Sequence, residues 1–125
     1  MNLRFSIDYP KTKAGRALWG KEYSLNAIYS GKHWRRRKAD AEYWHGLTHA
    51  ALRRAGIPRG PAKGPVSVRL WYDDRLDLDN HAYIRKLIID ALTGWVIEGD
   101  ARRHIRRITE GWHDEGRILV EVETE

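Results

Sequence analysis

The sequence predicts an α+β fold, a single domain with the order β-α-β-α-β-β in which a mixed sheet carries its helices on one face. Three observations support this class. Four short segments alternate apolar and polar residues, two segments repeat apolar residues with helical spacing, and Gly- and Pro-rich stretches separate several of them. The chain has 125 residues, 42% of them hydrophobic, and no cysteine, so it can bury one core without disulfides or thiolate metal sites. We expect one domain over residues 1–125.

The first half of the chain supplies one strand and one helix. Residues 3–7 alternate apolar and polar side chains, which predicts a strand. Residues 9–32 have no regular pattern and are rich in Gly, Lys and Tyr, so we expect a long irregular loop with a functional role. Helical spacing follows at Trp44, Leu47, Ala51 and Ala55. Breakers in residues 56–65 end this helix.

The second half adds a helix between strands. Residues 66–72 alternate and predict a strand, followed by a loop that contains Asp73, Asp74 and Arg75. A helix is predicted from an apolar stripe of i, i+3, i+4, i+7 and i+8 spacing, and Gly94 closes it. The stripe consists of Ile84, Leu87, Ile88, Ala91 and Leu92. Residues 105–112 and 118–122 predict the last two strands.

The charge of the chain favours a polyanionic partner. Lys and Arg number 23 against 17 acids, which gives a net charge of +6. Charge alone suits a soluble basic protein equally well. The candidate DNA-binding residues are Lys32, Arg35, Arg36, Arg37, Lys38, Arg75, Arg102 and Arg103. Such runs are also typical of solvated surfaces. The chain shows no apolar leader and no segment of membrane-spanning length, so we expect a cytoplasmic protein.

Three acids are candidate metal ligands. Asp77 and Asp79 follow the second strand, and in extended backbone their side chains point the same way, with Cα atoms about 6–7 Å apart. Hard cations such as Mg²⁺ prefer carboxylate oxygens in this arrangement. Asp100 begins the next strand, so we expect it to meet the other two. The same spacing also allows a loop acid, a helix cap and an unrelated surface acid.

Lys86 is a candidate cation for a phosphate, since it lies seven residues beyond Asp79 on the same helical face. A simple surface pair with Asp90, four residues further on, is the alternative.

Residues 77–100 resemble the signature of RusA-type Holliday junction resolvases, which are small, dimeric, Mg²⁺-dependent endodeoxyribonucleases of bacteria and prophages. The resemblance rests on D77-L78-D79-N80, Lys86, D90-A91-L92 and Asp100, and continues weakly in S24-L25-N26-A27-I28-Y29 and in the final strand. It implies metal binding by Asp77, Asp79 and Asp100. It implies a catalytic lysine at Lys86, although the shorter spacing of some members points to Tyr83.

The sequence departs from the family pattern near the last acid. Gly99 precedes Asp100 where the family often has a second acid, and Arg102, Arg103 and His104 occupy positions that are usually apolar.

The resemblance implies a specific activity and specific partners. We expect Mg²⁺, with Mn²⁺ substituting, to support paired nicks across a four-way DNA junction during recombination and repair. A homodimer acting at the nucleoid, encoded by a host or a prophage, is implied, without a membrane or a small-molecule cofactor. Residues 9–32 would then form a mobile loop that binds the junction. A non-catalytic DNA-structure-binding protein and a basic RNA-binding module are the alternatives.

Overall fold

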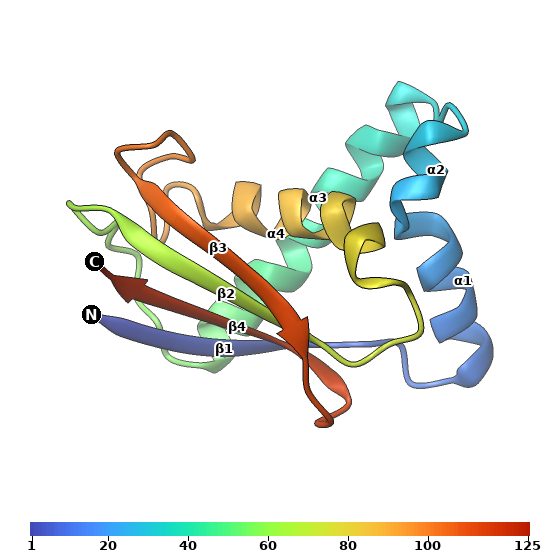
Figure 1. Cartoon of the computed structure of the whole chain (residues 1–125), viewed down its shortest axis with the longest axis horizontal. Coiled ribbons are helices and arrows are strands. Elements are labelled where there is room, and N and C mark those ends of the chain that lie inside the picture. Colours follow the sequence, from blue (N-terminus) through green and yellow to red (C-terminus); the bar gives the residue numbers. More distant parts are fainter.

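A four-stranded mixed sheet carries the fold in the computed structural model, which describes all 125 residues (Figure 1). The elements are β1 (Asn2–Asp8), α1 (Lys13–Tyr23), α2 (Leu25–Tyr29), α3 (Trp34–Arg54), β2 (Val66–Tyr72), the 3₁₀ helix η1 (Leu78–His81), α4 (Ala82–Leu92), β3 (Ile105–Trp112) and β4 (Arg117–Thr124). The predicted α+β class, mixed sheet and strand positions are confirmed. No helix combines the length and apolar character needed to cross a membrane.

The strand order β1-β4-β2-β3 leaves β1 and β3 at the two edges of the sheet. β4 is antiparallel to both β1 and β2, whereas β2 and β3 are parallel. The parallel pair requires a crossover, and η1 with α4 supplies it. The start of α4 therefore lies near the end of β2, and the end of α4 lies near the start of β3 (Figure 1).

The helices cover one face of the sheet, and strict alternation along β2 explains why. Val66, Val68, Leu70 and Tyr72 are fully buried on the helical side, within a single core of 23 residues. The side chains between them face the open side of the sheet, where Arg69 pairs with Glu123 of β4. The sequence pattern alone thus decided which face packs.

The predicted irregular loop over residues 9–32 is wrong, because α1 and α2 occupy most of it. The Thr12 hydroxyl caps α1 by accepting a hydrogen bond from Gly15 N at 2.9 Å. Trp19 is the one buried residue of α1, and its ring lies 5.0 Å from that of Tyr9 and 5.6 Å from that of Trp44. One aromatic anchor makes no periodic stripe, so the segment shows no helical pattern. Helix α3 begins at Trp34, so the basic run before the apolar stripe lies at the start of this helix, as predicted.

A buried cation fastens these helices to the rest of the fold. The Lys32 side chain is only 3% exposed, and its Nζ lies 2.5 Å from Asp40 Oδ2 and donates to Glu22 O at 2.8 Å. Tyr83 O–H also donates to Asp40 Oδ2, at 2.7 Å. Lys32 therefore joins the segment before α3 to α3 and α4. The prediction that Lys32 binds DNA is therefore wrong, because its buried ammonium is out of reach of a phosphate.

We expect Lys32→Ala to lower the free energy of unfolding by about 3–5 kcal/mol, since it leaves the Asp40 carboxylate buried without its cation. Urea unfolding followed by circular dichroism measures the loss. Lys38→Ala, an exposed position on α3, is the control and should change stability by less than about 0.5 kcal/mol. Unchanged stability of the Lys32 variant, with weaker DNA binding, would restore the original assignment.

Candidate functional site

The acidic turn, residues 73–81, connects β2 to α4 and carries four aspartates. Asp77 directly precedes η1 in extended backbone, at φ −61° and ψ 150°, yet its side chain makes no capping hydrogen bond. Asp79 lies in the first turn of η1, so the prediction that the two residues share an extended backbone is wrong. Both residues are exposed, and neither carboxylate takes part in an ion pair or a side-chain hydrogen bond. The helix-cap alternative for this pair is therefore not what the structure contains.

The other two aspartates hold the turn in place. Asp73 Oδ2 accepts a hydrogen bond from Gly116 N at 2.7 Å, which ties the turn to the β3–β4 connection. Asp74 accepts from Tyr9 O–H at 2.8 Å and from Leu76 N at 3.0 Å. Burial raises the pKa of the Tyr9 hydroxyl well above its ordinary value, so Tyr9 keeps its proton and remains a donor.

His81, at the C-terminal end of the turn, joins Tyr9 and Asp74 in a hydrogen-bonded cluster that we call the brace. Its side chain is fully buried, and Nε2 lies 2.8 Å from Asp74 Oδ2. Nδ1 lies 3.0 Å from Asp77 O and 3.1 Å from Leu78 O. Both ring nitrogens lie within hydrogen-bond distance of oxygen atoms, which fixes the orientation of the ring.

Aromatic rings enclose the histidine. The His81 ring stacks on Tyr72 with centroids 3.8 Å apart and meets Trp112 edge-on at 5.6 Å. The backbone of residues 77 and 78 is thus fixed by a buried side chain, while the carboxylates of Asp77 and Asp79 remain free. A rigid backbone that presents two free carboxylates has little freedom left to lose on binding a cation.

Asp100 does not join this pair within one chain. It lies between α4 and β3, at the start of the parallel strand pair, whereas the acidic turn follows the end of β2. No group of three His, Cys, Asp or Glu side chains in the chain is placed to hold a metal ion. The expected meeting of the three acids in a single chain is therefore wrong, because a crossover places the two loops at opposite ends of the sheet (Figure 1).

The two candidates for the catalytic lysine position differ in their surroundings. Lys86 is 65% exposed at its side chain and lies 3.3 Å from Asp90 Oδ2, as in the predicted i, i+4 pair. Tyr83 is buried, and its hydroxyl is used by Asp40. Of the two, only Lys86 is open to a ligand.

The basic residues divide between the two ends of the sheet. Arg35, Arg36, Arg37 and Lys38 are exposed in the first turns of α3, although Arg36 is held by Glu22 at 2.7 Å. Burial raises the pKa of the Tyr83 hydroxyl at the start of α4, and the charge of Arg37 partly opposes this rise. Arg75 is exposed on the acidic turn itself, and Arg102 and Arg103 are exposed beside Asp100.

Sequence reasoning missed the brace formed by Tyr9, Asp74 and His81. His81 is adjacent to Asn80, which gave a weak signal, but Tyr9 lies 65 residues from Asp74 and nothing in the pattern links the two. Comparison of the chain with protein-family models and with curated proteins finds no match.

We expect Tyr9→Phe to lower the free energy of unfolding by about 1–3 kcal/mol, because Asp74 loses a donor and Asp73 N loses its acceptor at 3.0 Å. Tyr29→Phe is the matched control, since Tyr29 is 78% exposed. Denaturant titration of both variants measures the difference. Equal stability of the two would show that the Tyr9 hydroxyl does not hold the turn.

Proposed function

We propose that this chain is a Mg²⁺-dependent endodeoxyribonuclease that resolves four-way DNA junctions by paired nicks, in recombination and repair. The observation that carries the proposal is the pair of free carboxylates, Asp77 and Asp79, on a turn fixed by buried hydrogen bonds. The net charge of +6 supports a nucleic-acid partner. The resemblance of residues 77–100 to RusA-type resolvases supplies the reaction and the substrate class.

The donor set fits a magnesium ion. Mg²⁺ is usually held in nucleotide-processing enzymes by one or two carboxylates, with water and substrate phosphate oxygens completing its octahedral shell. Asp77 and Asp79 would hold the ion, and both are exposed. When bound, such an ion lowers the pKa of a water molecule and neutralises charge on the phosphate.

The protein residues around the pair would position the DNA. Arg75 on the turn, together with Arg37 and Lys38 on α3, would contact backbone phosphates, and the salt dependence of binding should reflect their number. Lys86 would exchange its weak surface pair with Asp90 for a phosphoryl oxygen that gains charge during cleavage.

A homodimer suits this substrate. A four-way junction has approximate two-fold symmetry, and a C2 dimer presents two equivalent sites to opposing strands. The proposed dimer acts in the cytoplasm on nucleoid DNA, and either a host or a prophage could encode it.

We expect Asp77→Asn to abolish Mg²⁺-dependent nicking of a synthetic four-way junction while junction affinity stays equal or rises, because one negative charge near the phosphates is removed. Asp114→Asn makes the same charge change at an exposed residue of the β3–β4 connection and should retain activity. Gel analysis of nicked products and of bound junction measures both properties. Wild-type nicking by the Asp77 variant would refute the site.

Lys86→Ala should reduce the nicking rate by about 10²–10³ without a comparable loss of affinity, as expected for a group that stabilises charge in the transition state. Lys38→Ala is the control for loss of a positive charge and should mainly weaken binding. Single-turnover rates at saturating enzyme separate the two effects. A Lys86 variant that loses only affinity would be a binding residue.

A non-catalytic DNA-structure-binding protein is the second candidate. It is favoured by the lack of a three-acid group within one chain and by Gly99 beside Asp100. Incubation of the wild-type protein with junction DNA and either Mg²⁺ or Mn²⁺ separates the two functions. Tight binding with no nicked product under either metal selects this candidate.

A further inference from the structure

The turn between α2 and α3 exposes two large aromatic side chains. Trp34, the first residue of α3, is 63% exposed, whereas Trp19, Trp44 and Trp95 are buried in the core. Tyr29, the last residue of α2, is 78% exposed. The turn lies at a corner of the molecule, away from the sheet (Figure 1). Exposed aromatic groups of this size are typical of binding surfaces, since folding alone gives no reason to leave them in water.

The Trp34 ring is held in place by its neighbours. His33 Nδ1 accepts a hydrogen bond from Arg35 N at 3.1 Å, which caps α3 and fixes the His33 ring. That ring stacks on Trp34 with centroids 5.7 Å apart, and the Arg35 guanidinium carbon lies 5.3 Å from the Trp34 centroid. These contacts leave most of the Trp34 side chain open. A ring that is already ordered loses little freedom when a flat ligand stacks on it.

Positive charges without acidic partners surround this ring. Arg35, Arg37 and Lys38 are exposed and form no ion pair, whereas Arg36 is held by Glu22. The first turn of α3 contains no acid. Cations at this position oppose the helix dipole, so they do not stabilise α3. An exposed ring among unpaired cations suits a ligand that combines an aromatic face with negative charge.

A polar hollow of about 640 Å³ adjoins the ring through His33. Arg36 contributes to the same wall, and Lys21, Asn26 and Ser30 belong to the remainder of the lining. Only one lining residue is hydrophobic. The volume lies within the range of small-ligand sites. Its amino, amide and hydroxyl groups are the kinds that contact sugar and phosphate oxygens of nucleic acids.

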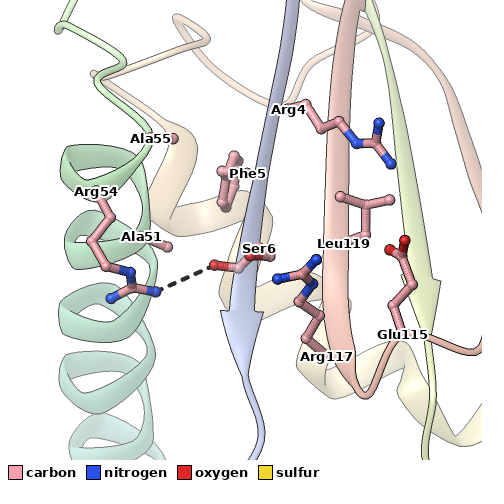
Figure 2. Close-up of a pocket in the computed structure, with 9 residues that line it drawn as sticks. All are labelled: Arg4, Phe5, Ser6, Ala51, Arg54, Ala55, Glu115, Arg117 and Leu119. Carbon is pink, nitrogen blue, oxygen red and sulfur yellow. Dashed lines mark hydrogen bonds between the residues drawn. The ribbon is translucent and has the colours of Figure 1, made fainter.

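Another basic hollow of the chain lacks an exposed ring. Arg4, Arg54 and Arg117 line a hollow of about 460 Å³ at the β1 edge of the sheet (Figure 2). Its one aromatic side chain, Phe5, is buried. This hollow offers charge alone, whereas the turn between α2 and α3 offers charge and a face for stacking. The two surfaces therefore differ in whether they can distinguish a base from a phosphate.

We propose that Trp34, Arg35, Arg37 and Lys38 form a single-strand surface, on which an unpaired DNA base stacks against Trp34 and the three cations contact the flanking phosphates. The polar hollow takes the adjoining sugar and phosphate. Stacking of this kind tolerates any sequence, because every base has a π-face. The surface favours DNA with unpaired bases over perfect duplex, in which each base is already stacked within the helix.

The single-strand surface lies on the same side of the molecule as the start of α4. Helix α2 packs against η1, and Asp40 of α3 accepts a hydrogen bond from Tyr83 of α4 at 2.7 Å. Trp34 precedes Asp40 by about 9 Å along the helix axis. In the proposed nuclease, the surface would hold a base opened at the centre of a junction. This consequence rests on the proposed function, whereas stacking of a base on Trp34 does not.

DNA binding without a divalent metal tests the surface independently of nicking. Fluorescence anisotropy compares a labelled oligothymidylate, whose bases are unpaired, with a duplex of the same length. Trp34→Ala should weaken oligothymidylate binding about 5- to 100-fold and leave duplex binding unchanged. Trp34→Phe retains a ring and should recover much of the loss. Arg4→Ala removes a charge from the hollow without an exposed ring and should not change the ratio of the two affinities.

An abasic strand and added salt separate stacking from charge. The wild-type protein should bind an abasic oligonucleotide about as weakly as Trp34→Ala binds oligothymidylate, and the variant should lose nothing further on the abasic strand. Arg35→Gln should weaken binding to both DNAs and reduce the slope of log affinity against log salt concentration by about one. An unchanged slope would contradict the phosphate contact.

Equal binding of oligothymidylate by Trp34→Ala and the wild type overturns the proposal, as does an equal loss for both DNAs. Tighter binding of oligouridylate than of oligothymidylate, or a Trp34→Ala loss confined to anionic lipid vesicles, overturns the assignment to DNA. Selective loss of single-strand binding, with no junction nicking by the wild type, rejects the nuclease and keeps the surface. Wild-type nicking with unchanged single-strand binding by Trp34→Ala rejects the surface alone.

Discussion

The parallel pairing of β2 with β3 constrains where the three candidate acids of this protein lie. A parallel pair needs a crossover, and α4 fills it, so the segments on either side of that helix leave the sheet at opposite ends. Two acids follow one end and the third precedes the other. The topology of the sheet keeps Asp100 away from Asp77 and Asp79 within one chain, and a change of side-chain rotamer cannot bring them together. The single chain therefore does not bring the three carboxylates together.

The buried polar brace gives the acidic turn its character. A loop that follows a strand is normally mobile, but Asp74 here collects Tyr9, Leu76 and His81 around one carboxylate. Buried polar groups that are fully paired fix a single backbone conformation. Asp73 and Asp74 accept the hydrogen bonds that hold the turn, whereas Asp77 and Asp79 remain free at the surface. Of the four aspartates in this turn, two therefore stabilise its backbone and two are exposed to solvent.

The basic residues likewise differ in burial, although they are close together in the sequence. Lys32 and Lys38 belong to one run of the sequence, yet Lys32 is enclosed by Glu22, Asp40 and two aromatic rings, whereas Lys38 is exposed. The buried cation adds to the aromatic contacts of Trp19 and Tyr23 that hold this segment against α3. Charge counted along a sequence therefore overstates the positive surface that a polyanion can reach.

The amino-acid sequence by itself determined the strands, the helix α4 and the buried face of the sheet, because period-2 and period-3.6 spacing report local burial directly. It missed α1 and α2, since those helices bury few side chains and are held by aromatic and ionic contacts with distant residues that leave no periodic trace. It identified Asp77, Asp79, Asp100 and Lys86 as candidates. Only the tertiary structure decided that Asp100 stands apart and that Tyr9 supports the turn, because both depend on contacts between segments far apart in the chain.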